Sequence, residues 1–554
     1  MSTVSVGMLV IVVVAVIVIV FASTLASRIG IAGPLVLVAV GVAISLLPAV
    51  PAVAVNPELI LVGVLPPLLY SSAVSAPAIE LRRDLRAIGG LAILLVIVSS
   101  ILLGLFFWWA IPGLGLPLAI ALGAILSPTD AVATAIVRKQ GVPRRVITLL
   151  EGESLLNDAS ALVLLRTAIA ATAAGFSFVA TLGAFAWAVV SAVVIGAAAG
   201  ILALQLRAWT RNATASTAIG LVVPYLAYLP TDALHGSGLV AAVVAGVVCG
   251  QGAVRSLTPE QRISDRLTWR TIEFILEGAV FLIMGLELYG IVEKNLAATE
   301  GLLRGISIAA AALVILIVVR AAYVMPMLAF HSSRVRRATR HRLESTRARG
   351  RAPSVERAGR IRADIDYFDT SPLTWKHSVI VTWAGMRGVV TLAAAQTLPR
   401  DTPERELLVF IAFVVAAGSL LLQGLTLPVV VRLLGLGRAT TSALPRRAIR
   451  AVDVELRRAA QAAIADRSLR RDAGAFSDQV YVNPPLRFLA ALDPPESSSG
   501  PEALEFELAL IGVMRRRLRQ MAASGEYSTS VVRYVFDELD AYEISVKLHL
   551  ESEG

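Results

Sequence analysis

Apolar runs of about twenty residues recur from the N-terminus to position 434, and short charged segments separate them. A helix of that length crosses the hydrocarbon core of a bilayer. By this criterion we predict thirteen membrane-spanning helices. The hydrophobic fraction of 56% in 554 residues also exceeds that of ordinary soluble domains. The expected fold is therefore an all-α polytopic membrane protein.

The first predicted span has no basic segment before it and is too long for a signal peptide, so we expect a membrane helix there. The thirteen spans are about 5–25, 29–47, 57–75, 86–111, 115–137, 145–173, 177–206, 214–230, 234–250, 268–288, 301–330, 375–398 and 406–434.

Arginine and lysine gather in every second loop, including a long basic loop at 331–374, whereas the opposite loops hold few of them. Basic loops stay on the cytoplasmic side. We therefore predict a multi-pass protein of a bacterial plasma membrane, with the N-terminus outside and the C-terminus in the cytoplasm. The net charge of +10 resides mostly in these loops, so the bilayer, and not nucleic acid, is the expected partner.

The sequence predicts neither a disulfide nor a metal centre. Cys249 is the single cysteine, so no intrachain disulfide is expected. No Cys/His spacing resembles a metal centre, and we expect neither a cofactor nor an enzyme.

After position 436 the chain becomes soluble in character. Helical periodicity is present at 440–472, 502–521 and 528–550, and proline-rich segments interrupt it. No catalytic motif occurs here. We expect a helical cytoplasmic tail at 436–554 that modulates transport or stabilises a dimer, although an inert appendage fits nearly as well.

Two predicted spans contain clustered acidic residues. One reads Ser127-Pro128-Thr129-Asp130, and the next reads Glu151-Gly152-Glu153-Ser154-Leu155-Leu156-Asn157-Asp158. Ionisable groups inside a membrane are costly and mark ion or proton pathways. One membrane aspartate can simply pair with an arginine, but four acids with Ser, Thr and Asn on adjacent spans indicate a site.

The positions within these spans favour a midplane site. In a helix, Asp158, Ser154 and Glu151 share one face, and Asp158 lies roughly 20 Å in from Arg145. Pro128 breaks the preceding helix. Broken helices at the midplane form the cation sites of secondary transporters.

Two arginines also fall within spans, and each needs an acidic partner because arginine cannot lose its charge. Arg320 lies in the eleventh span and Arg387 in the twelfth, between weakening glycines. Asp130, Glu153 and Asp158 are the candidate partners. If two of them are paired, one remains free to titrate. Glu277 on the tenth span adds polarity that suits an entry funnel or a helix end.

The broken fifth and twelfth spans occupy equivalent places in two runs of three. This arrangement suggests an inverted repeat whose two breaks cross at the site.

These segments closely resemble the sodium/proton exchangers of the cation:proton antiporter-1 family, of the NhaP type. The matching stretches are Ser127 to Val132, Glu151 to Asp158, Phe274 to Ala279, Gly285 to Leu288 and Met386 to Val390. The resemblance extends over all predicted spans but not the tail.

The resemblance implies a role for each site residue. Asp158 would carry the cation or the proton, with Ser154 and the Thr129 backbone as further ligands of a monovalent cation. Asn157 would brace the broken helix, and Glu153 would pair with Arg320. Asp130 and Arg387 would neutralise the crossed helix ends.

The resemblance also implies a homodimer in which a mobile core moves against a panel of other helices. The core would comprise 86–173 and 301–435, and the panel 1–85 and 174–300. Where the family usually has Leu-Pro-Pro-Leu-Leu-Phe-Glu, this chain has Ser71 in place of the acid. That departure puts any pH-sensing role of this position in doubt.

The function expected from these features is antiport of a monovalent cation, with sodium the first candidate, against a proton. Asn157 cannot titrate and Glu153 is expected to be paired, so the exchange should be electroneutral, one for one, with elevator-type alternating access. Potassium/proton antiport by the same fold is the alternative. A cation channel and an intramembrane aspartyl protease using Asp130 and Asp158 are weaker alternatives. No filter-like repeat occurs, and the Gly-x-Gly-Asp context of such proteases is missing.

Overall fold

The computed structural model describes residues 3–48, 56–130, 132–174, 178–210, 212–297, 302–348, 367–368, 373–436, 446–471, 474–482 and 500–553. The first half of the bundle contains α1 (Thr3–Ile29), α2 (Gly33–Ser45), the π-helix η1 (Leu59–Val64), α3 (Leu65–Ser75), α4 (Ala78–Arg83), α5 (Leu85–Gly89), the π-helix η2 (Gly90–Leu94), α6 (Leu95–Ala110), α7 (Leu116–Leu126), α8 (Val132–Lys139) and α9 (Arg144–Ala174).

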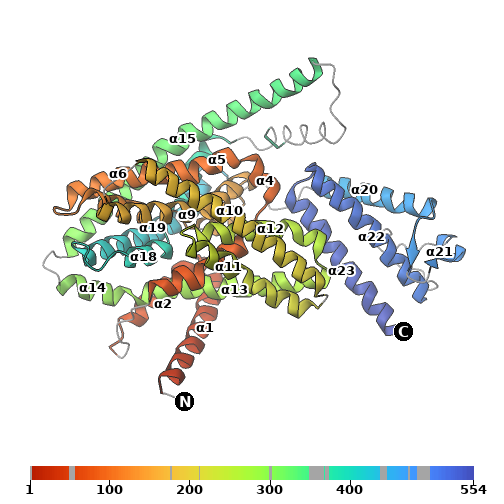
Figure 1. Cartoon of the computed structure of the whole chain (residues 1–554), viewed down its shortest axis with the longest axis horizontal. Helices are drawn as coiled ribbons and strands as arrows, with labels where there is room; N and C mark the ends of the chain where they lie inside the picture. Colours follow the sequence, from red (N-terminus) through yellow and green to blue (C-terminus); the bar gives the residue numbers. More distant parts are fainter. Residues whose placement is uncertain are drawn as a thin grey trace.

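The second half of the bundle continues in the same all-helical manner (Figure 1). It contains α10 (Phe178–Trp209), α11 (Ala213–Ala233), α12 (Gly238–Ser256), α13 (Pro259–Leu286), α14 (Leu288–Ala297), α15 (Leu302–Ala348), α17 (Trp375–Trp383), α18 (Val389–Gln396) and α19 (Arg405–Leu433).

Apolar residues both fill the bundle and cover its outside. A continuous buried core extends from α1 to α19. Large apolar side chains are also exposed on the outer helices, such as Phe21, Trp109 and Val318. Exposed apolar surface on this scale matches contact with lipid rather than with water.

The described residues include nine helices that are long and apolar enough to cross a membrane, and shorter apolar helices at Gly33–Ser45, Leu59–Ser75 and Leu116–Leu126. Each predicted span overlaps at least one helix, and the fifth and twelfth each overlap two short helices separated by a break. The all-α membrane fold is confirmed, while the number thirteen stays a prediction.

Two boundaries differ from the sequence prediction. α15 continues to Ala348, so the basic segment does not become a loop at position 331. Arginine and alanine are good helix formers, and hydropathy alone does not register this. α13 begins at Pro259 rather than near 268, because Thr258 and Gln261 form a capping box before its polar first turns. Most of the predicted loop, at 349–366 and 369–372, lies outside the described residues.

The tail contains α20 (Arg446–Ala465), α21 (Asp478–Val482), α22 (Pro501–Ser524) and α23 (Thr529–Glu553). The predicted helix at 440–472 is too long at its C-terminal end, because β1 (Arg470–Arg471) pairs antiparallel with β2 (Gly474–Ala475) there. The proline-rich segment at 483–499 lies outside the described residues. α20, α22 and α23 share a separate apolar core.

The tail is docked onto the membrane bundle beside α4, α12 and α13 (Figure 1). At the start of α23, the backbone N–H and the hydroxyl of Thr529 donate to the carboxylate of Glu80 at 2.9 and 2.5 Å. Further along α23, Asp537 accepts from Arg266, and Lys547 bonds to Glu260 at 2.9 Å. The tail therefore contacts several elements on one face of the bundle.

Candidate functional site

Two interrupted helices meet inside the bundle. One interruption separates α7 from α8, and the other separates α17 from α18. The backbone N–H of Asp130 donates to the carbonyl of Met386 at 2.7 Å, so the two breaks touch. Pro128 has no N–H of its own, which explains why α7 does not continue through this segment. Free backbone groups and four helix ends are thus concentrated at one point.

Asn157 braces the extended segment of the first break from the neighbouring helix α9. Its side-chain Nδ2 donates to the carbonyl of Thr129 at 3.2 Å and to the Thr129 hydroxyl at 2.8 Å. The Asn157 side chain is almost fully buried, and its Oδ1 has no hydrogen-bond partner in the described part of the chain. Buried side-chain acceptors usually have a donor, so this oxygen is an exception that needs an explanation.

Glu153 and Arg320 form a buried ion pair between α9 and α15. The two guanidinium nitrogens lie 2.5 and 2.8 Å from the two carboxylate oxygens, and both side chains are 2% exposed. Arg320 also donates to the carbonyl of Val381 near the end of α17. The pairing that the resemblance implied is therefore present, and it ties the acid cluster to the second broken helix.

Arg387 lies at the C-terminal end of the half-helix α7. Its Nε donates to the carbonyl of Leu126 at 3.0 Å, and its Nη1 donates to the carbonyl of Gly385. Its backbone N–H donates to Ser419 on α19. The last carbonyls of a helix carry partial negative charge. A guanidinium at this position neutralises that helix end.

Asp130 occupies the complementary position at helix N-termini. One carboxylate oxygen accepts from the backbone N–H of Val132, the first residue of α8. The same carboxylate lies against Gly388, which immediately precedes α18. Negative charge is stabilised where unpaired N–H groups point out of a helix. Asp130 and Arg387 therefore lie at the helix ends that the resemblance expects them to neutralise.

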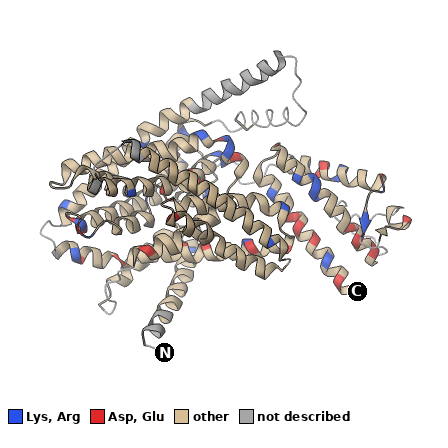
Figure 2. Ribbon diagram, in the orientation of Figure 1, with Lys and Arg blue, Asp and Glu red and all other residues tan. Residues whose placement is uncertain are grey.

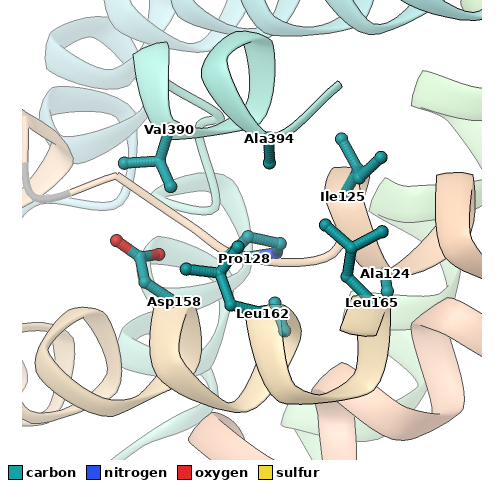
Figure 3. A pocket seen from close by; sticks show the side chains of 9 residues that line it. Ala124, Ile125, Pro128, Asp158, Leu162, Leu165, Val390 and Ala394 are labelled. Atoms are coloured by element: carbon teal, nitrogen blue, oxygen red, sulfur yellow. The ribbon is translucent and has the colours of Figure 1, made fainter. Parts of the chain in front are cut away.

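Asp158 is the acid of this group that remains without a partner. Within the described residues it has no hydrogen bond or ion pair, although it is only 7% exposed. Its carboxylate projects from α9 toward the extended chain of the first break, next to Val390 (Figure 3). A cavity of about 10 Å³ adjoins it and is lined by Ala124, Ile125, Pro128, Asp158, Ala161, Leu162, Leu165, Val390 and Ala394. This volume is roughly that of one water molecule. Ser154 is buried one turn before Asp158.

Further acids lie on α13. Glu277 is partly buried and makes no hydrogen bond or ion pair within the described part of the chain. One turn earlier, Glu273 accepts a hydrogen bond of 3.2 Å from Ser71 on α3. The position at which the family pattern places an acid therefore contacts a carboxylate from another helix.

Two buried ion pairs were not anticipated from the sequence. Asp84 binds Arg145 at 2.8 Å, and Tyr367 donates to the same carboxylate at 2.9 Å. Arg207 lies 2.8 Å from Asp265 in a pair that joins α10 to α13. The four charged residues of these pairs fall at the edges of predicted spans, where charged residues are ordinary topology signals, so nothing in the pattern distinguishes them.

A polytopic helical protein with two crossed broken helices and one unpaired buried carboxylate at the crossing belongs to the class of secondary transporters. Comparison with known proteins makes this more specific. The model of the family described as "Sodium/hydrogen exchanger, transmembrane" matches residues 12–433. The chain therefore belongs to the sodium/hydrogen exchanger family and is an antiporter rather than an enzyme.

Individual relatives agree with the family match. The chain is 30% identical to a Na(+)/H(+) exchanger of Mycobacterium tuberculosis over 437 residues, which is 76% of this chain and 74% of that protein. It is 29% identical to the Na(+)/H(+) exchanger YjcE of Escherichia coli, over 88% of this chain and 89% of that protein. The structure of the sodium proton antiporter MjNhaP1 from Methanocaldococcus jannaschii has the same fold. It superimposes with a TM-score of 0.57 at 15% identity, over 78% of this chain and 99% of that one.

Proposed function

We propose that the chain exchanges one monovalent cation for one proton at Asp158. The observation that carries this proposal is the difference between Asp158 and its neighbours. Glu153 is neutralised by Arg320, and Asp130 is engaged at helix N-termini, whereas Asp158 has no partner in the described structure and adjoins a cavity. A buried carboxylate needs either a proton or a cation to offset its charge. The two therefore compete for one place.

The cation ligands are expected around the same carboxylate. Asp158 supplies the negative charge, and Ser154 and the carbonyl of Thr129 supply neutral oxygens. The unpartnered Oδ1 of Asn157 is a further candidate. Oxygen donors of this kind suit a hard cation such as sodium. Sodium is accordingly our first candidate.

Potassium is the second candidate. One relative, from Bacillus pumilus, is described as a sodium, potassium, lithium and rubidium/H(+) antiporter. It is 28% identical over 71% of this chain and 57% of that protein. That breadth supports testing several cations rather than sodium alone.

The pairing of the other acids supports electroneutral exchange. Asn157 has no charge to titrate, and the Arg320 guanidinium offsets the charge of Glu153 through two hydrogen bonds. One group then changes its proton occupancy in each cycle. The site crosses the membrane neutral, whether it holds one proton or one monovalent cation.

Movement of the site is proposed to follow an elevator. Residues 86–173 and 301–435 would form the moving core, and residues 1–85 and 174–300 a panel that also forms a homodimer. The N-terminus would lie outside and the tail in the cytoplasm, as the distribution of arginine and lysine in the loops predicts. The cavity beside Asp158, at about 10 Å³, is far smaller than a continuous channel pore, which favours this mechanism.

The test is cation-driven proton movement in everted membrane vesicles, with sodium, lithium and potassium added in turn. Wild-type vesicles should release protons on addition of the transported cation, and Asp158→Asn should abolish this release. The matched control is Asp232→Asn, which removes the same charge from an exposed pair with Arg166. Normal exchange in a folded Asp158→Asn variant would contradict the proposal.

A further inference from the structure

Charged residues are concentrated in the tail and at the face of the bundle that receives it (Figure 2). At this junction, α23 of the tail lies between α13 of the bundle and α22 of the tail. Asp540 on α23 is 1% exposed and accepts from two arginines at once. Arg262 on α13 donates to it at 2.8 Å, and Arg515 on α22 donates at 2.7 Å.

Three more arginines lie near Arg262 and Arg515. Arg255 lies in the last turn of α12, and Arg516 and Arg519 lie on α22. Burial lowers the pKa of Arg519, and the neighbouring guanidinium groups of Arg515, Arg262, Arg255 and Arg516 lower it further. Arg255, Arg262, Arg515 and Arg516 therefore all lie close enough to Arg519 to act on its charge. We call them the arginine cluster: Arg255, Arg262, Arg515, Arg516 and Arg519.

The arginine cluster holds more positive charge than its surroundings neutralise. Its carboxylates within the described structure are Asp540 and Glu543, against five guanidinium groups. Glu543 also contacts Lys547 at 3.0 Å, and Lys547 is paired in turn with Glu260 at 2.9 Å. Arg255, Arg516 and Arg519 have no ion pair among the described residues.

This excess is only partly shielded from solvent, because Arg255 and Arg516 are exposed and Arg519 is half-buried. The Nε groups of Arg515 and Arg519 are buried and have no acceptor in the described part of the chain. Arginine remains charged at all physiological pH values, so the cluster cannot relieve its repulsion by losing protons. A bound anion with several acceptor oxygens would remove both the repulsion and the unsatisfied donors.

We propose that the arginine cluster is a binding site for an anion that carries more than one phosphate group. Planar guanidinium groups bind phosphate oxygens in pairs, and a single carboxylate would leave most of the excess uncompensated. The site joins two membrane helices to the tail. Anion binding there strengthens the docking of the tail onto the bundle.

The position of the cluster allows two sources for such an anion. Arg255 ends one apolar helix and Arg262 begins the next, so the cluster lies at the level of the membrane surface. Headgroups of anionic lipids are concentrated at that level. Soluble pyrophosphate-containing molecules offer the same chemistry from the cytoplasm. The two sources are separated by the experiment.

The experiment measures the thermal unfolding midpoint of the purified full-length protein. One arm adds inorganic pyrophosphate to protein in detergent, with sodium chloride at equal ionic strength as the reference. The other arm compares nanodiscs that contain cardiolipin with nanodiscs of phosphatidylcholine alone. At least one probe should raise the midpoint of the wild type by about 2–4 °C. A response to pyrophosphate identifies a soluble ligand, and a response to cardiolipin alone identifies a lipid.

A charge-matched pair of variants tests the location. The cluster variant is Arg255→Gln with Arg516→Gln and Arg519→Gln. The control is Arg446→Gln with Arg447→Gln and Arg450→Gln, which removes the same charge from the exposed start of α20. The cluster variant should lose the shift and, without any anion, be at least as stable as the wild type because repulsion is relieved. The control should keep the shift.

A charge reversal gives a second readout that does not depend on the probe. Arg516 is exposed, and Arg516→Glu places a carboxylate beside the cluster. This variant should unfold at a higher temperature than the wild type in the absence of anion. The proposal is overturned if neither probe shifts the wild type, if the cluster variant keeps the shift, or if Arg516→Glu does not unfold at a higher temperature than the wild type.

Discussion

The carboxylate of Asp130 occupies the space in which a side chain at Gly388 would begin. A Cβ added to Gly388 would overlap with the Oδ2 and Cγ atoms of Asp130. The two residues belong to different broken helices, so this contact fixes how closely the breaks approach each other. Gly388 is therefore required by the space at the crossing, in addition to any effect on the flexibility of its own segment.

Replacement of Gly388 by alanine should displace Asp130 from the helix N-termini and reduce exchange about tenfold or more, because small displacements at a site are costly. The control is Gly418→Ala on α19, whose added Cβ would meet only a Leu313 atom at 4.0 Å. Exchange rates in proteoliposomes, normalised to folded protein, check both. Equal activity of the two variants would mean that the contact does not position the crossing.

The sequence predicted the acid cluster, the two breaks and the two membrane arginines, because charge and proline inside apolar runs are conspicuous. The sequence did not show that Arg387 binds the end of α7 rather than a carboxylate. The acceptor is the backbone carbonyl of Leu126, and because every residue has such a carbonyl, the sequence does not single it out. The sequence pattern alone left Asp130, Glu153 and Asp158 interchangeable as partners. Only the family resemblance and the three-dimensional positions separate their roles.

Arg320→Ala should leave Glu153 buried without its partner and cost about 3–5 kcal/mol of stability. Replacing both, with Arg320→Met and Glu153→Leu, should cost clearly less than the sum of the single changes, because no uncompensated charge remains. The exposed pair of Arg166 and Asp232 is the control, and its loss should cost only about 0–1 kcal/mol. Thermal or denaturant unfolding of the purified protein measures all of these. Additive losses at the buried pair would show that the two residues act independently.

Orientation in the membrane is open to cysteine labelling, because the native Cys249 is 2% exposed and should give little background. A cysteine in place of Gln520, exposed on α22, should react with an impermeant maleimide only from the cytoplasmic side. A cysteine in place of Asp401, exposed after α18, should react only from outside. Labelling of intact cells and of everted vesicles distinguishes the two faces. The reverse pattern would overturn the predicted topology.

The most direct test of one-for-one exchange at Asp158 is the null point of the flux in proteoliposomes. Net exchange should stop when the inside-to-outside ratio of the cation equals that of the proton, and this point should not move when the membrane potential is changed. The potential is set once with valinomycin and potassium and once with a thiocyanate gradient, so that competition by potassium is recognised. A null point that stays fixed in both series is the predicted result. A null point that shifts with voltage in both would show that a second charge moves in each cycle, which would contradict exchange through Asp158 alone.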